Sequence, residues 1–277
     1  MGKIMKFSIK TSTLSIAAIL ISFNTFASDI NSKVVSADDI TWGYLNPLRG
    51  ELSPGAANLW GDRTKDTATG MLVRFKKGFE SPPHIHNITY RGVVIDGLMH
   101  NDDPSAEKML LPSGSFWTQP AGEDHITAAN GESNLIYLEI DSGPYLVQPS
   151  AEKFDNGERP LNLHRDNIVW LNNHDLHDIK AKGVKSSFLW DRNSTIGGSM
   201  VKLPVGYDGT IYSQASEFRM VVISGEIKYR SNQKSDVKNL AAGSYIESTG
   251  DFSHNITNPT DQEVTIYIRT NAKYQVM

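Results

Sequence analysis

The chain is 277 residues long, carries a formal net charge of −4 and contains no cysteine. The absence of cysteine excludes disulfides, thiolate metal sites and thiol nucleophiles, so any metal must be held by nitrogen and oxygen. The weak negative charge, with no cluster of Lys and Arg, argues against nucleic acid and anionic membranes as partners.

The first 27 residues have the pattern of a secretory signal peptide. Lysines precede a mostly apolar run over residues 14–23, and the small residue Ala27 suits cleavage before Ser28. This apolar run is too short to span a bilayer. We therefore expect residues 1–27 to be removed on export, leaving a periplasmic or secreted bacterial protein with no membrane association.

The rest of the chain repeats itself at a period of about 128 residues. The matched segments are 70–73 with 198–201, 93–97 with 221–225, and 111–115 with 240–244. The matched glycines indicate shared turns, because glycine readily adopts a positive φ. The repeat predicts two domains of similar fold, 28–148 and 149–277, with the polar segment 143–167 as their connector.

Short apolar or alternating runs bounded by Gly, Pro, Asn and Asp predict strands in both copies. These runs cover residues 71–75, 91–95, 135–140, 199–203, 220–223 and 265–268. No segment of similar length has a convincing 3.6-residue period. We therefore predict an all-β fold of the sandwich or small-barrel type.

Three histidines of the first copy form the strongest candidate site. His84 and His86 stand two residues apart on a predicted strand, so their side chains point to the same face of the sheet. His125, behind a Pro-x-Gly turn on a nearby strand, can complete a three-nitrogen cradle for a divalent metal. Free imidazoles take up protons below about pH 6.5, so metal affinity is expected to fall there.

The second copy does not repeat this set of ligands. Alignment by the repeat places Tyr212 and Gln214 opposite the paired histidines and keeps only His254. We expect His254 to be a hydrogen-bonded structural residue, and the second domain to be structural or to hold a ligand without metal. His174 and His177 have the spacing of a ligand pair, but their polar segment is more typical of a solvated loop.

The glycine and histidine spacings resemble the two motifs of the cupin superfamily. The matching positions are Gly78, His84, His86 and Gly97 in the first motif and Gly114, Pro120, Gly122 and His125 in the second, with Asn130 one residue late. Over nearly all of its mature length the chain resembles bacterial two-cupin (bicupin) proteins of unassigned function. These in turn are similar to the cupin domain of zinc-binding anti-sigma factors.

This resemblance implies two tandem jelly-roll β-barrels after the signal peptide, with His84, His86 and His125 as ligands of one metal. Tyr90 stands where the family has a glutamate ligand. A phenol with an ordinary pKa of about 10 is a poor ligand. We therefore expect Tyr90 to line the pocket as a candidate catalytic residue that orients water or substrate.

Three neutral imidazoles suit both Fe(II) and Zn(II), and the sequence does not choose between them. An Fe(II) site predicts a small-molecule oxygenase, since some three-histidine cupins are oxygenases that cleave small chelating substrates. A Zn(II) site predicts the alternative, a non-catalytic metal- or ligand-binding protein in which the metal is structural or senses a small ligand. Cupin relatives often pair through strand edges, so a homodimer stays an open expectation.

Overall fold

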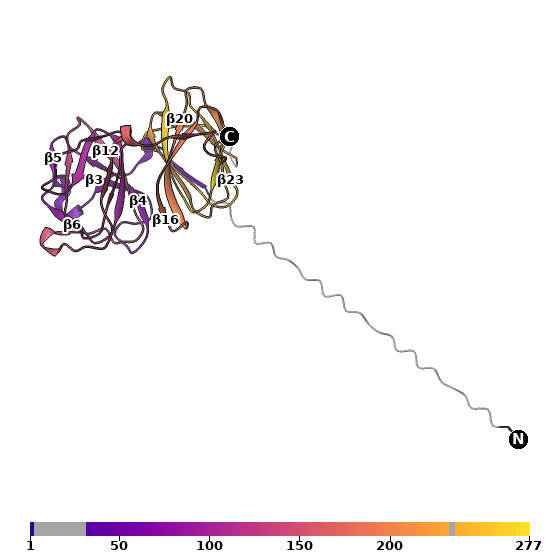
Figure 1. The fold of residues 1–277 in the computed structure, drawn as a ribbon, viewed down its shortest axis with the longest axis horizontal. Coiled ribbons are helices and arrows are strands. Elements are labelled where there is room, and N and C mark those ends of the chain that lie inside the picture. Colours follow the sequence, from indigo (N-terminus) through magenta and orange to yellow (C-terminus); the bar gives the residue numbers. More distant parts are fainter. Residues whose placement is uncertain (3–31, 233–235) are drawn as a thin grey trace.

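The computed structural model describes residues 1–2, 32–232 and 236–277 (Figure 1). The expected signal peptide, residues 1–27, lies outside the described residues except for Met1 and Gly2. The described part of the chain is nearly all β, as predicted, with short 3-10 helices at η1 Ala37–Asp39, η2 Pro47–Leu52, η3 Ser150–Glu152 and η4 Arg165–Asn167. None of the helices in this part has the length and hydropathy needed to cross a bilayer.

Strands β2 to β14 form the N-terminal half of the fold. They are β2 Gly43–Tyr44, β3 Gly55–Trp60, β4 Thr69–Phe75, β5 Phe79–Glu80, β6 His84–His86, β7 Tyr90–Asp96, β8 Leu98–Asp102, β9 Leu111–Pro112, β10 Phe116–Gln119, β11 Ile126–Ala129, β12 Asn134–Ile140, β13 Val147–Pro149 and β14 Leu161–Leu163. One sheet has the order β14-β10-β7-β12-β4-β3-β2. Facing strands form the sheet β5-β11-β8-β9 and the pair β13-β6.

The C-terminal half is built in the same way from β1 and β15 to β25. These strands are β1 Ser32–Val35, β15 Leu171–Asn172, β16 Lys185–Arg192, β17 Ile196–Leu203, β18 Asp208–Ser213, β19 Phe218–Ser224, β20 Glu226–Ser231, β21 Lys238–Ala241, β22 Tyr245–Ser248, β23 Phe252–Thr257, β24 Val264–Thr270 and β25 Tyr274–Val276. A seven-stranded sheet has the order β1-β22-β19-β24-β17-β16-β15, and a five-stranded sheet has the order β21-β20-β23-β18-β25.

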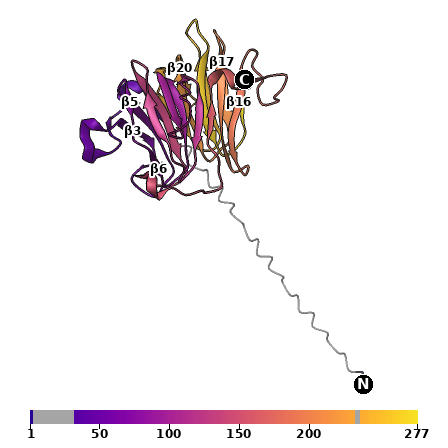
Figure 2. The same ribbon diagram turned by 60° about the vertical axis from the view of Figure 1, so that its left-hand side comes forward.

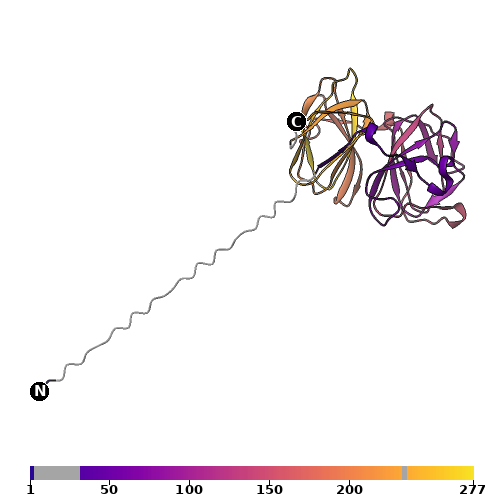
Figure 3. The same cartoon turned by 180° about the vertical axis from the view of Figure 1, so that it is seen from behind.

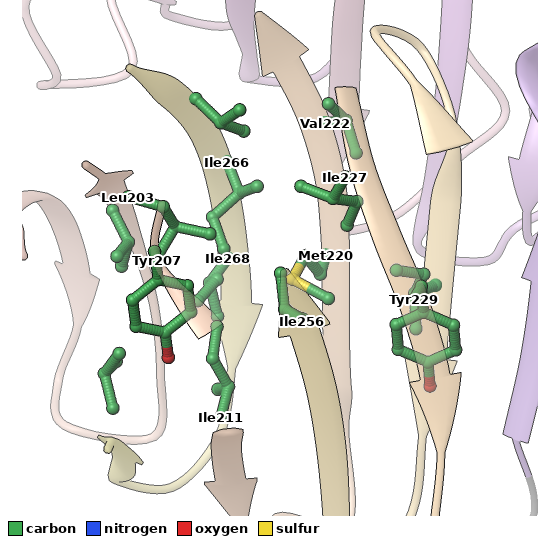
Figure 4. Packing of buried hydrophobic residues seen from close by; sticks show 14 of the residues in the cluster. Leu203, Tyr207, Ile211, Met220, Val222, Ile227, Tyr229, Ile256, Ile266 and Ile268 are labelled. Carbon is green, nitrogen blue, oxygen red and sulfur yellow. The ribbon is translucent and has the colours of Figure 1, made fainter. Parts of the chain in front are cut away.

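Apolar side chains fill the space between the two sheets of the C-terminal half. Figure 4 shows Leu203, Ile266 and Ile268 of the seven-stranded sheet on one side of this core, with Ile227 and Tyr229 of β20 on the other. All five side chains are buried. Ile211, which lies opposite His254 as His84 lies opposite His125, also belongs to this core.

The central strands of the seven-stranded sheets are covered on both faces. In β12, Ile136 and Leu138 pack inside the N-terminal half, whereas Tyr137 joins a third core shared with Met200 and Tyr267 of the C-terminal half. Figure 2 shows the strands of the two halves standing side by side across this shared core. Strands that are buried on both faces have nearly continuous apolar sequences, which is the pattern that predicts β4, β12, β17 and β24.

Matched residues of the two copies cross over between the halves. The guanidinium of Arg91 lies 3.7 Å from the ring centre of Trp190, and its repeat counterpart Arg219 lies 3.9 Å from the ring centre of Trp60. Each cation therefore stacks on the indole of the other half, a contact that strengthens where water is excluded. The interface is pseudo-symmetric, and each half provides the same two residue types.

Two strands lie on the far side of the expected boundary between residues 148 and 149. β1 pairs with β22, with Ser32 opposite Ser248, and is therefore the edge strand of the C-terminal sheet. Figure 3 shows β1 in indigo against that half. β14 pairs with β10, Phe116 opposite Leu163, and so edges the N-terminal sheet. The segment 143–167, read from sequence as a connector, thus contains β13 and β14.

Candidate metal centre

His84, His86 and His125 meet in the interior of the N-terminal half. β6 carries His84 and His86, and His84 forms an antiparallel bridge with His125, the residue before β11. The backbone N–H groups of His84 and His125 donate to each other's carbonyl oxygens at 3.0 Å. One ring nitrogen from each of the three histidines lies within 4.8 Å of the others. The three positions singled out from sequence are therefore brought together.

Backbone carbonyl oxygens fix the orientation of all three imidazole rings. The Nδ1 atom of His84 lies 2.9 Å from the carbonyl oxygen of Pro82, that of His86 lies 2.8 Å from that of Leu146, and that of His125 lies 3.1 Å from that of Glu123. A carbonyl oxygen only accepts, so each Nδ1 carries the hydrogen. Each Nε2 is then unprotonated and presents a lone pair, which is the tautomer of histidines that bind a metal.

Burial keeps these three rings neutral. It is the main cause that lowers the pKa of His84, lowers that of His86 well below its usual value, and lowers that of His125 to about 3. Neighbouring imidazoles add to the shift at His86 and His125. Because neutral imidazole is the ligand form, we now expect protons to compete with a metal only at a lower pH than the value of about 6.5 for free imidazole.

Tyr90, the candidate catalytic residue, lies beside this cluster on β7. Its Oη donates to Oδ1 of Asn101 at 2.8 Å and lies 3.3 Å from Nε2 of His125. The amide of Asn101 in turn donates to Gln119 at 2.8 Å. Burial raises the pKa of Tyr90, so the phenol stays protonated. Because the hydroxyl hydrogen of Tyr90 points to Asn101, the lone pairs of Tyr90 Oη face the same space as the histidine lone pairs.

Tyr145 is a residue of the site that the motifs do not reveal. Its Oη lies 3.1 Å from Nε2 of His86, and its ring stacks on that imidazole with 4.3 Å between ring centres. Burial raises the pKa of Tyr145 well above its ordinary value, so this phenol is also a donor. It follows β12 in the segment interpreted as a connector, and no motif of the sequence points to it.

The cluster fits a divalent cation by its chemistry. Two acceptor atoms, Tyr90 Oη and His125 Nε2, stand 3.3 Å apart while their hydrogens are directed to Asn101 and Glu123. A cation between them would satisfy both lone pairs. Among the described residues the cluster contains no carboxylate, so a bound metal would keep its full charge. Such all-imidazole faces suit Zn(II) and Fe(II).

The C-terminal half places other residues at these positions. Ile211 lies opposite His254 as His84 lies opposite His125, so the counterparts of His84 and His86 are Ile211 and Ser213, not Tyr212 and Gln214. The predicted alignment was wrong by one residue, because residues 81–83, which include Pro82, break the chain into two strands, β5 and β6, whereas β18 is continuous.

His254 is a hydrogen-bonded structural residue, as predicted. Its Nδ1 lies 2.9 Å from Tyr229 Oη, and its Nε2 lies 3.0 Å from Ser248 Oγ. The ring stacks on Phe218 with 4.8 Å between ring centres. His174 and His177 are both exposed and lie outside the one metal-compatible cluster found among the described residues.

The family model for a domain of unknown function, DUF4437, matches residues 33–277, which is nearly the whole described chain. The chain belongs to the DUF4437 family. A comparison with functionally curated proteins gave no match.

Solved structures that share the cupin fold resemble this member of DUF4437 over most of its length. A protein of Nostoc punctiforme with a provisional dioxygenase assignment has a TM-score of 0.65 at 13% identity, covering 89% of this chain and 86% of its own. The oxalate decarboxylase of Lactobacillus farciminis gives 0.56 at 14% identity, covering 88% and 87%. The salicylate 1,2-dioxygenase of Pseudoaminobacter salicylatoxidans, solved as gentisate adducts, gives 0.54 at 9% identity, covering 80% and 76%. These likenesses establish the cupin fold for the chain.

Proposed function

We propose that this DUF4437 protein binds one divalent metal through His84, His86 and His125 and acts as an Fe(II)-dependent oxygenase on a small chelating molecule. The observation that carries the proposal is the common orientation of the three rings, each with Nδ1 donating to a backbone carbonyl oxygen and Nε2 unprotonated. When bound, Fe(II) would supply the redox chemistry and hold the substrate through its oxygen atoms.

The chain's own residues would position that substrate. Tyr90 and Tyr145, whose ring centres lie 5.9 Å apart, place their phenol oxygens beside Nε2 of His125 and of His86 respectively. Both stay protonated because burial raises their pKa values. Tyr90, whose hydrogen is donated to Asn101, would accept a hydrogen bond from a substrate hydroxyl. Tyr145 would donate to a substrate oxygen once a metal takes its place at Nε2 of His86. Neither phenol would add negative charge to the site. The buried surroundings would exclude bulk water, which strengthens these polar contacts.

Two of the structural neighbours support an oxygenase. One is a salicylate dioxygenase solved as gentisate adducts, and another carries a provisional dioxygenase assignment. Gentisate bears adjacent phenol and carboxylate oxygens, the kind of chelating pair that a three-nitrogen face leaves room for. Gentisate and salicylate are therefore the first molecules to test as substrates.

The burial of the cluster favours a second candidate, a closed Zn(II) site that is structural or senses a small ligand. His86 and His125 are 1% and 0% exposed, and Tyr145 covers His86. Structural zinc sites are typically closed to solvent, whereas catalytic sites keep an open position. In such a closed zinc site, no substrate would reach the metal.

Oxygen consumption separates the two candidates. The metal-free protein would be loaded with Fe(II) without oxygen, and then oxygen uptake would be recorded with gentisate, salicylate, catechol and oxalate. We expect uptake that depends on one of the aromatic chelators, that is lost in His84→Ala and that is slowed about tenfold in Tyr90→Phe. Tight zinc binding with no uptake for any chelator would contradict the oxygenase and favour the closed site.

We further propose that the two halves are tandem cupin barrels of an exported, periplasmic or secreted bicupin, and that the chain pairs as a homodimer. The pseudo-symmetric sheets and the crossed Arg–Trp contacts support the tandem arrangement. The signal-peptide pattern supports export. Similarity to anti-sigma cupin domains stays a prediction. Mass spectrometry of the protein recovered from a bacterial periplasm would show whether the chain begins at Ser28.

A further inference from the structure

The C-terminal half contains a cavity of about 1000 Å³ that shares no residue with the histidine cluster. The cavity opens between the ends of β16 and β17, the segment 175–179 and the segment 270–274. Its volume is within the range of small-molecule sites, which is roughly 300–1,000 Å³. Neither the metal centre nor the cupin fold assigns a role to it.

A shortened turn creates this cavity. In the N-terminal half, residues 61–68 join β3 to β4, and the backbone N–H of Tyr145 donates to the carbonyl oxygen of Arg63 at 2.8 Å. That loop therefore closes over the chain that follows β12. In the C-terminal half, only residues 193–195 join β16 to β17. Residues 271–273, which join β24 to β25, are therefore not covered by the turn between β16 and β17, and the cavity remains open there.

Small polar side chains also replace apolar ones at the base of the cavity. By register, Ser199 and Ser186 stand where the N-terminal half has the core residues Met71 and Ala56. Oγ of Ser199 lies 2.8 Å from Oη of Tyr274, and Oγ of Ser186 lies 3.4 Å from the same atom. The base is thus a group of three hydroxyls in place of packed hydrocarbon.

The walls of the cavity are apolar and its rim is mostly acidic. Phe188 lines the cavity and is 67% exposed. The other apolar lining residues are Leu176, Ile179, Leu189, Trp190, Ile196 and Ala272. The charged lining residues are Asp175, Asp178, Asp191 and Lys273. Three carboxylates against one ammonium group disfavour an anionic ligand.

We propose that this cavity binds an uncharged aromatic small molecule that carries one hydrogen-bonding group. The ring would lie against Phe188 and the apolar walls, and the polar group would bond with the hydroxyls of Tyr274, Ser199 and Ser186. This division between an apolar surface and a few converging polar groups is typical of small-molecule sites. The proposal is independent of the metal centre and of the function proposed for it.

A neutral fluorescent probe, N-phenyl-1-naphthylamine, tests the assignment. We expect it to bind the full chain at one equivalent, with a dissociation constant in the micromolar range. Ser199→Met restores the residue type of the N-terminal half and fills the base, so it should weaken binding at least tenfold. Phe188→Ser should weaken binding similarly. His84→Ala, in the other half, and Val205→Ser, at an exposed apolar residue outside the cavity, should bind as the parent does.

Several outcomes would overturn the proposal. One is the absence of saturable binding by the parent protein, and another is equal binding by the parent, Ser199→Met and Phe188→Ser. If the circular dichroism spectrum of Ser199→Met shows that this variant is unfolded, the binding measured for Phe188→Ser alone tests the proposal. Phe188 is exposed, so its side chain can be exchanged without disturbing a core. The anionic probe 8-anilinonaphthalene-1-sulfonate should bind at least tenfold more weakly, and equal affinity would refute the assignment to uncharged ligands.

Discussion

At the scale of single residues, three backbone carbonyl oxygens determine what the histidine cluster can do. They hold the hydrogens of His84, His86 and His125 on Nδ1, so the opposite nitrogens face a common space as acceptors. Burial lowers the pKa values of the three histidines, so their rings are neutral. Without a cation, the three Nε2 lone pairs would face one another. The site is therefore preorganised for a metal before any metal arrives.

Tyr145 is expected to control access to this site. Its ring covers His86 with 4.3 Å between ring centres, so removal of the ring in Tyr145→Ala should expose the nitrogen face. We predict that bound metal is then lost to excess chelator about ten times faster, measured by stopped-flow with a chromogenic chelator. Tyr145→Phe keeps the ring and should match the parent. Equal rates for all three proteins would show that the ring is not a barrier.

His254 should make the stability of the protein sensitive to acid. Burial lowers its pKa to about 3 in the folded state, against an ordinary value of about 6.5 in the unfolded chain. Its contribution is therefore complete above pH 6.5 and is lost as the pH falls towards 3, because the unfolded state takes up the proton first. The loss amounts to about 1.4 kcal/mol per pH unit.

Urea titrations at pH 7 and pH 4.5 measure this effect. In His254→Gln, which keeps polar atoms near Tyr229 and Ser248, the decrease in unfolding free energy between the two pH values should be smaller by about 2–3 kcal/mol than in the parent. The same decrease in both proteins would mean that His254 is already protonated in the fold, or is not desolvated.

Sequence reasoning at the residue scale succeeds where spacing determines direction. The i, i+2 pair of His84 and His86 on a strand must face one side, and the Pro-x-Gly turn before His125 brings it to them. Tyr145 could not be found in this way. It reaches His86 through the path of the chain after β12, and that path depends on the contact of Tyr145 with the loop 61–68.

At the scale of strands, β12 and β24 carry a buried ion pair between matched positions of the repeat. Nη1 of Arg269 lies 3.3 Å from Oε1 of Glu139, and both residues are buried, 3% and 1% exposed. The same arginine reaches Asp141 at 2.9 Å and Glu217 at 2.9 Å. The hydroxyl of Tyr267 also donates to Glu139 at 2.8 Å. Arg269 thus contacts three carboxylates, of which Asp141 also pairs with Arg91 and Glu217 also pairs with Arg219.

Arg269→Met should therefore destabilise the protein strongly. It leaves Glu139 buried without a cation, and breaking a buried pair on one side costs about 3–5 kcal/mol. Urea denaturation checks this value, with Arg159→Met as the control, because Arg159 pairs with Asp155 in solvent and should leave the midpoint almost unchanged. A similar small change in both variants would contradict the role of the shared core.

The register of the second copy shows the limit of sequence comparison between elements. The repeat predicts the sheets and their central strands because β4, β12, β17 and β24 each contain a run of mostly apolar residues. It fails between Glu80 and His84, where Pro82 has no N–H to donate and one extra residue is accommodated. A constant spacing cannot detect such a local insertion, although the conclusion that the second copy lacks the ligand set holds.

At the scale of the whole molecule, the two halves are joined by more than the connector. They share a core that includes Tyr137 and Tyr267, β1 edges the C-terminal sheet, and β14 edges the N-terminal sheet. Calorimetry should therefore show one unfolding transition, with equal calorimetric and van't Hoff enthalpies. Two separable transitions would mean that the halves fold independently and that the shared core contributes little.

The most direct test of the account is the metal content of the purified, tag-free protein beside His84→Ala, measured by elemental analysis. We predict about one divalent metal per chain in the parent, iron if the oxygenase is correct, and loss of most of it in the variant while the circular dichroism spectrum is retained. His254→Gln should keep the full amount, because His254 lies outside the cluster. Equal metal in the parent and His84→Ala, or none in either under metal-replete conditions, would contradict the histidine centre itself.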